Sequence, residues 1–141
     1  MLKVLLVDDE PFIVQGLSAL IDWEKEGFEI VGTAGNGSEA VEFLKSNPVD
    51  LILADIKMPV MNGLEFLKYI RETHLSEAFF VILSGYGDFT YAKEAIKWQC
   101  TDYILKPIQK SQLLALLSKV KQMQQDKKEE SERIRKIGKA Y

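Results

Sequence analysis

Acidic residues follow two segments of the sequence that are otherwise apolar. Asp8 and Asp9 come directly after residues 3–7, and Asp55 comes directly after residues 51–54. If both segments are parallel strands of one sheet, their carboxyl ends lie at the same edge and the three carboxylates converge there. Like charges that close repel one another unless a shared proton or a hard divalent cation screens them. We therefore predict a site for Mg²⁺ or Mn²⁺, which oxygen ligands suit.

Two further strand-like segments end in groups that can hold a phosphoryl group. Residues 102–105 are followed by Lys106, which supplies an ammonium group, and residues 80–83 are followed by the hydroxyl of Ser84. A carboxylate can attack phosphorus while cations and hydrogen-bond donors hold the phosphoryl oxygens. Because its strand is central in the predicted sheet, Asp55 is the expected nucleophile. A lone acid at a strand end is more often a helix cap or a loop residue, but this combination favours phosphoryl transfer.

A sheet with helices on both faces must position these groups. Five short apolar segments (residues 3–7, 29–33, 51–54, 80–83 and 102–105) alternate with amphipathic stretches (residues 12–23, 38–46, 63–73 and 89–98), and a last helix begins near Ser111. Strands that are apolar almost throughout are covered on both faces. We predict a doubly wound α/β fold of the flavodoxin-like kind, with five βα units and the parallel strand order 2-1-3-4-5.

The last helix has a heptad pattern of its own. Apolar residues recur at three-four spacing until a charged layer, Lys127 and Glu130, interrupts them; they are Leu113, Leu116, Val120, Met123, Ile134, Ile137 and Tyr141. Residues 122–128 are almost wholly polar. We favour a solvated helical linker that frays after about Gln124, with a dimerising coiled coil as the alternative.

Composition excludes several classes of protein. With 18 basic and 21 acidic residues among 141, the formal net charge is −3, so no overall positive field attracts nucleic acid or an anionic membrane. The longest apolar runs are far shorter than a bilayer span, and we expect a cytoplasmic protein without membrane partners. Cys100 is the only cysteine, which rules out an internal disulfide, and we expect it to be buried. His74, the only histidine, is expected at the surface, and Trp23 and Trp98 are expected to pack at helix ends.

Taken together, these residues resemble the receiver domains of bacterial two-component response regulators, over about residues 2–122. Asp8 and Asp9 match the acidic pair of the family, and residues 55–59 (Asp-Ile-Lys-Met-Pro) match its phosphoacceptor motif. The remaining matches are Gly63 at the start of a helix, Ser84, Tyr103 and Lys106-Pro107.

The resemblance implies a role for each of these residues. A sensor histidine kinase would phosphorylate Asp55, which would bind Mg²⁺ directly together with Asp9 and the backbone carbonyl of Lys57; Asp8 would act largely through water. Lys106 would pair with the phosphoryl group. Ser84 would move inward to bond a phosphoryl oxygen, and the ring of Tyr103 would enter the vacated space. Tyr86 would shield the acyl phosphate from water.

The expected function is therefore signalling and not enzymatic turnover, apart from self-catalysed phosphotransfer and slow loss of the phosphoryl group. The switch would change the face formed by the fourth helix, the fifth strand and the fifth helix, with a homodimer as one outcome of phosphorylation. Residues 23–32 and 84–97 are similar to receivers that precede an AraC-type helix-turn-helix output domain. We expect a receiver domain over residues 1–122 and a helical linker over residues 123–141. The linker would lead to an output domain that is absent from this chain. DNA would be bound only through that output domain.

Two departures from the family pattern and two other functions deserve weight. Gln99 stands where the subgroup usually has a glycine, so this turn must accommodate a left-handed residue or take another shape. Ser84 replaces the commoner threonine and keeps only the hydroxyl.

A degenerate receiver that serves only protein contacts is the main alternative. A phosphohydrolase of the haloacid-dehalogenase type is disfavoured, because such enzymes need an acid where this chain has Lys57.

Overall fold

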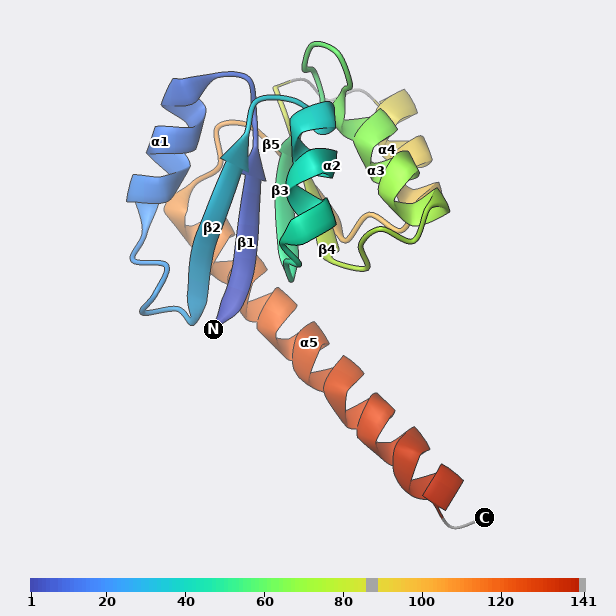
Figure 1. Cartoon of the computed structure of the whole chain (residues 1–141). Coiled ribbons are helices and arrows are strands. Elements are labelled where there is room, and N and C mark those ends of the chain that lie inside the picture. The colour runs from blue at the N-terminus through green and yellow to red at the C-terminus, as the bar shows by residue number, and fades with distance from the viewer. Residues whose placement is uncertain (86–88, 140–141) are drawn as a thin grey trace. The chain divides into compact units, whose positions relative to one another are not determined.

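Five parallel strands form one sheet at the centre of the fold, in the order β2-β1-β3-β4-β5 (Figure 1). The strands are β1 (Leu2–Val7), β2 (Phe28–Ala34), β3 (Leu51–Asp55), β4 (Phe79–Ser84) and β5 (Asp102–Leu105). This computed structural model describes residues 1–85 and 89–139. The predicted strand number, direction and order are confirmed.

The three central strands, β1, β3 and β4, are buried on both faces along most of their length. One apolar core cluster includes alternate strand residues, among them Leu5, Ile52 and Phe80. It also includes helix residues such as Phe66, whose ring centroid lies 5.5 Å from that of Phe80. The intervening strand residues, such as Leu53, are also buried. This burial explains why the strands are apolar almost throughout.

Three helices cover that cluster: α2 (Gly37–Ser46), α3 (Gly63–Glu72) and α4 (Phe89–Lys97). Each of α2 and α3 begins at an asparagine whose side chain accepts a hydrogen bond from the backbone N–H three residues later. At α3, Glu65 also bonds back to the N–H of Asn62, which completes a capping box.

Residues 1–108 form one compact unit. Its remaining helix, α1 (Pro11–Leu20), is shorter than predicted. We expected it to continue to Trp23, because the apolar periodicity does. Instead, the chain turns after Leu20 and the buried Trp23 indole N–H donates to the carbonyl of Leu17 at 3.1 Å. Tertiary packing of the indole thus takes precedence over helical periodicity.

The helix α5 (Lys110–Lys139) belongs to a second unit, residues 109–141. Among the α5 residues whose burial the structure describes, the buried ones all lie in the first half of the helix: Leu113, Leu116, Leu117 and Val120. Residues 125–136 are exposed. In the structure the helix continues past Gln124 to Lys139. Among the described residues, no helix is both long and apolar enough to cross a bilayer.

Candidate functional site

The carboxyl edge of the sheet brings the predicted site residues together. Asp55 and Ser84 are the last residues of β3 and β4, while Asp8 and Lys106 follow β1 and β5. Two backbone hydrogen bonds fix the ends: Asp8 N–H donates to Ala34 at 2.9 Å, and Lys106 N–H donates to Ser84 at 2.7 Å. The convergence expected from parallel strands is therefore present.

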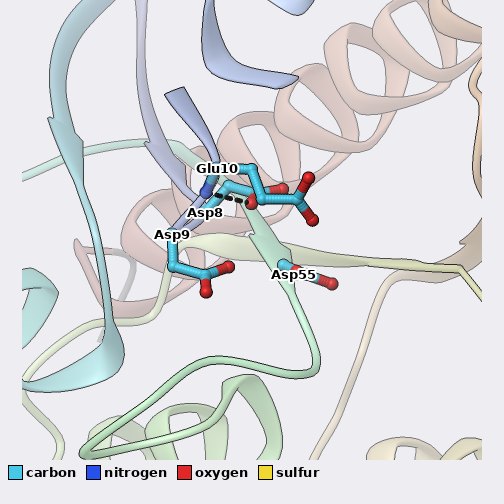
Figure 2. Close-up of side chains that lie close together, drawn as sticks. All are labelled: Asp8, Asp9, Glu10 and Asp55. Atoms are coloured by element: carbon cyan, nitrogen blue, oxygen red, sulfur yellow. Dashed lines mark hydrogen bonds between the residues drawn. The ribbon is translucent and has the colours of Figure 1, made fainter. Parts of the chain in front are cut away.

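Four carboxylates surround one space at this edge (Figure 2). Oxygen atoms of Asp8, Asp9, Glu10 and Asp55 all lie within 4.8 Å of one another. Asp8 and Asp55 are buried, each 6 % exposed, whereas Asp9 and Glu10 are exposed. Glu10 was not predicted as a ligand; its backbone N–H also donates to Asp8 Oδ1 at 2.9 Å.

Lys106 neutralises part of this charge. Its Nζ lies 2.7 Å from Asp8 Oδ2 and 3.3 Å from Asp55 Oδ2. Burial alone lowers the pKa of Lys106, but its hydrogen bond to Asp8 and the charge of Asp55 outweigh that effect and raise the pKa above its usual value. The ammonium group thus stays protonated in contact with both buried acids.

Asp55 sits in a closely packed backbone environment. Its Oδ1 accepts a hydrogen bond from the backbone N–H of Ile56 at 2.8 Å. Burial raises the pKa of the Asp55 carboxyl group, and the charge of Lys106 opposes this rise without cancelling it. A Cβ atom at Gly63 would lie 2.1 Å from the carbonyl oxygen of Asp55, so only glycine fits at the start of α3. The glycine predicted to open this helix therefore has a steric reason.

A hollow of about 350 Å³ opens above the acids. Its lining includes Asp9, Asp55, Lys57, Gly85 and Lys106. Carboxylates, an ammonium group and free space are thus adjacent, which is the arrangement that a phosphoryl group needs. The all-oxygen donor set fits Mg²⁺, which prefers oxygen ligands and retains water molecules.

The two predicted switch residues lie on neighbouring strands. Ser84 is buried, 2 % exposed, and Tyr103 is half-buried against the main apolar cluster. Within the described part of the chain, the Tyr103 hydroxyl is buried without a hydrogen-bond partner. Tyr86, which we expected to shield the phosphoryl group, lies outside the described residues.

The residues judged structural lie away from the carboxyl edge. Gln99 does adopt a left-handed conformation, with φ of 63°. The side chain of His74 is 83 % exposed, as predicted. Cys100 is only partly buried, and its thiol donates to the carbonyl of Asp102 at 2.8 Å. Arg71, which binds several backbone carbonyls, was missed because an arginine on a helix looks like a solvated residue in sequence.

Comparison with known proteins gives a consistent result. The family model for the response regulator receiver domain matches residues 4–118. The chain is 40 % identical over 120 residues to the uncharacterized transcriptional regulatory protein YesN of Bacillus subtilis, covering 85 % of this chain and 32 % of YesN. It therefore spans about a third of the length of that relative.

Solved structures agree with this result. The REC domain of AraT, a response regulator from Geobacillus stearothermophilus, superimposes with a TM-score of 0.82 at 38 % identity, covering 90 % of this chain and 98 % of that domain. A chain of the CheX–CheY–BeF3–Mg²⁺ complex from Borrelia burgdorferi superimposes with a TM-score of 0.76 at 31 % identity, covering 84 % of this chain and 88 % of that chain. With this fold and this acidic edge, the chain belongs to the receiver domain family of two-component response regulators.

Proposed function

We propose that this chain is a phosphorylation-activated receiver that accepts a phosphoryl group on Asp55 from a sensor histidine kinase and controls a transcriptional output. The observation that carries the proposal is the placement of Asp55. Its buried carboxylate lies 3.3 Å from the ammonium group of Lys106, beside three further acids and at the wall of an open hollow. An acid buried there serves no purpose in packing that an apolar residue would not serve better.

In the proposed transfer, an oxygen of Asp55 forms a bond to phosphorus as the P–N bond to the donor imidazole breaks. The electron pair stays on the imidazole nitrogen, which then takes up a proton. Lys106 pairs with the phosphoryl oxygens, and the backbone N–H of Ile56 holds the second carboxylate oxygen. Asp9, Asp55 and the Lys57 carbonyl would hold Mg²⁺ directly and Asp8 through water; the bound ion would neutralise the phosphoryl oxygens. Glu10 is close enough to join this set.

The proposed response is transmitted by Ser84 and Tyr103. Ser84 bonds the phosphoryl group, and the ring of Tyr103 moves within the space beside it. Two exposed apolar residues lie on the elements next to this pair: Ile96 on α4 is 74 % exposed and Leu105 on β5 is 52 % exposed. We propose that this face, with α5, changes its contacts on phosphorylation, and that one such contact is a second copy of the chain.

Residues 1–122 remain the proposed receiver domain, and residues 123–141 the proposed helical linker toward an output domain. The name of the YesN relative, of which the chain spans about a third, supports a transcriptional output. DNA binding is assigned to that output domain and not to this chain, whose net charge is −3.

Two other functions are less well supported. A degenerate receiver acting only as a contact module would not need the buried pair of Asp55 and Lys106. A phosphohydrolase would need a general acid two residues after the nucleophile, where Lys57 stands. Phosphorylation of Asp55 would exclude the contact module.

The direct test is the intact mass of the protein after incubation with Mg²⁺ and acetyl phosphate. The wild type is expected to gain one phosphoryl group, and the gain is expected to disappear with EDTA or with Asp55→Ala. Asp50→Ala provides a matched control, because it removes an aspartate next to the opposite end of β3. Absence of an adduct, together with failure to bind beryllofluoride, would favour the contact module.

Self-association has its own test. Sedimentation velocity is expected to show a larger species with beryllofluoride and Mg²⁺ than without them. Ile96→Ser with Leu105→Ser should abolish the increase, whereas Phe12→Ser, which alters an 84 % exposed residue on α1, should not. Equal sedimentation coefficients in both conditions would count against dimerisation on phosphorylation.

A further inference from the structure

The turn between α4 and β5 contains a residue in an unfavourable backbone conformation. Gln99 has φ of 63° and an exposed side chain, so it gains no packing energy there. A left-handed conformation costs a residue with a side chain about 1 kcal/mol more than it costs glycine. The turn is closed by backbone bonds from Gln99 N–H to Ile96 at 3.1 Å and from Cys100 N–H to Ala95 at 3.0 Å. Such bonds are common where a helix ends in a left-handed residue, which is usually glycine, so they do not explain the glutamine.

Arg71 of α3 also binds this turn, through two of its backbone carbonyls. Its guanidinium donates to the carbonyl of Trp98 at 3.3 Å and to that of Gln99 at 3.3 Å. It also donates to Ser76 and Ala78, each at 2.9 Å, in the connection from α3 to β4. Five N–H groups in a rigid fork allow one arginine to hold four carbonyls, which lysine cannot do.

The guanidinium is a costly group to place there. Arg71 is half-buried, and burial lowers its pKa from the usual value of arginine. Buried charge is retained where it forms several hydrogen bonds. A second contact between α3 and this turn reinforces the position, since the Lys68 ammonium lies 5.7 Å from the centre of the Trp98 ring.

The held turn leads directly into β5. Thr101, two residues after Gln99, is fixed to β4 by its N–H bond to Phe80 at 2.7 Å and by the bond that its hydroxyl accepts from Phe80 at 3.1 Å. Tyr103 follows two residues later and Lys106 three residues after that. The path of the chain through the turn therefore determines the positions of Tyr103, the proposed switch residue, and Lys106, the proposed phosphoryl-binding lysine.

We propose that Arg71 is a positioning residue for the switch: by holding the strained turn at Gln99 from α3, it fixes the place of Tyr103 on β5. The inference rests on the proposed function for what Tyr103 does, but the placement itself is a property of the unphosphorylated protein. Gln99→Gly removes the backbone strain and leaves the carbonyl that Arg71 holds. This variant therefore separates an effect of Arg71 on the stability of the protein from an effect on the position of Tyr103.

The experiment compares amide chemical shifts of Tyr103 and Leu105 by NMR, before and after phosphorylation with acetyl phosphate and Mg²⁺. Arg71→Lys and Arg71→Gln are each made in the wild type and in the Gln99→Gly background. Arg133→Lys, on an exposed arginine of α5, is the matched control. Intact mass reports phosphorylation in every sample, and thermal unfolding reports stability.

Both Arg71 variants are expected to move the Tyr103 amide resonance in the unphosphorylated protein and to reduce its response to phosphorylation roughly twofold or more. Gln99→Gly should restore the unfolding temperature without restoring that response. The inference would be overturned if the Tyr103 amide responded fully to phosphorylation in both Arg71 variants. It would also be overturned if Gln99→Gly restored both the unfolding temperature and that response. A wild type that gains no phosphoryl mass would refute the proposed function, while a moved Tyr103 resonance in the variants would still uphold the positioning role.

Discussion

Asp55 illustrates how one residue can serve a site at a cost to folding. Burial raises the pKa of its carboxyl group in the folded protein, so the folded state binds this proton more tightly than the unfolded chain does. Ionisation of Asp55 therefore disfavours folding, and stability falls as the pH rises above the ordinary aspartate pKa of about 4. Under the proposed function, this cost is offset because Asp55 is the phosphoryl acceptor at the hollow that it lines.

Asp55→Asn is accordingly expected to stabilise the metal-free protein at pH 7, by on the order of 1 kcal/mol. The gain should shrink as the pH falls toward 4, where Asp55 is itself protonated. Thermal unfolding in EDTA across this pH range measures the effect. Mg²⁺ should narrow the difference at pH 7 by stabilising only the wild type. A gain that is independent of pH would show that charge is not its cause.

A second prediction contrasts two glycines, Gly63, which is crowded by its surroundings, and Gly16, which is not. Gly63→Ala brings a Cβ atom to 2.1 Å from the Asp55 backbone, while the same change at Gly16 meets no atom within 4 Å. We expect Gly63→Ala to lose about 2–4 kcal/mol in urea unfolding and to slow phosphorylation. Gly16→Ala, inside α1, should gain up to about 1 kcal/mol, because alanine is the better helix former. Equal effects of the two changes would contradict the close approach.

At the scale of elements, the start of α3 is fixed by its capping box. Asn62→Ala removes the acceptor for the Glu65 N–H bond at 2.8 Å, and we expect it to cost about 1 kcal/mol in urea unfolding. Asn62→Asp keeps an acceptor and a negative charge at the helix N-terminus, so it should stay within a few tenths of a kcal/mol of the wild type. Equal losses in both variants would show that the amide donor, and not the cap, is what matters.

The elements also show what could be predicted from sequence. The central strands were predictable because they are buried on both faces. The acids at Asp8 and Asp55 were predictable because parallel strands end at one edge. The end of α1 was not predictable, because Trp23 continues the apolar pattern but lies beyond the end of the helix. Arg71 was also missed, since its partners are backbone carbonyls up to 28 residues away, which carry no side-chain signal.

At the scale of the whole molecule, the chain consists of a compact unit of residues 1–108 and a second unit that contains the long helix α5. The last buried side chain of α5 that the structure describes is Val120, and Met123 and Gln124 are partly exposed. The helix beyond them gains little from packing, and isolated helices of this length are marginal in water. The heptad pattern offers a partner helix as one source of stability.

A chain ending at Gln124 separates the two readings of this segment. If residues 125–139 form a solvated linker, the truncated chain should unfold within about 1 °C of the full chain, because no buried side chain among the described residues is lost. Its helical signal in circular dichroism should fall. Leu117→Ala, which truncates a 1 % exposed side chain, should instead cost about 2–4 kcal/mol. If the segment forms a coiled coil between two copies, the full chain should unfold at a temperature that rises with protein concentration, and truncation should abolish that rise.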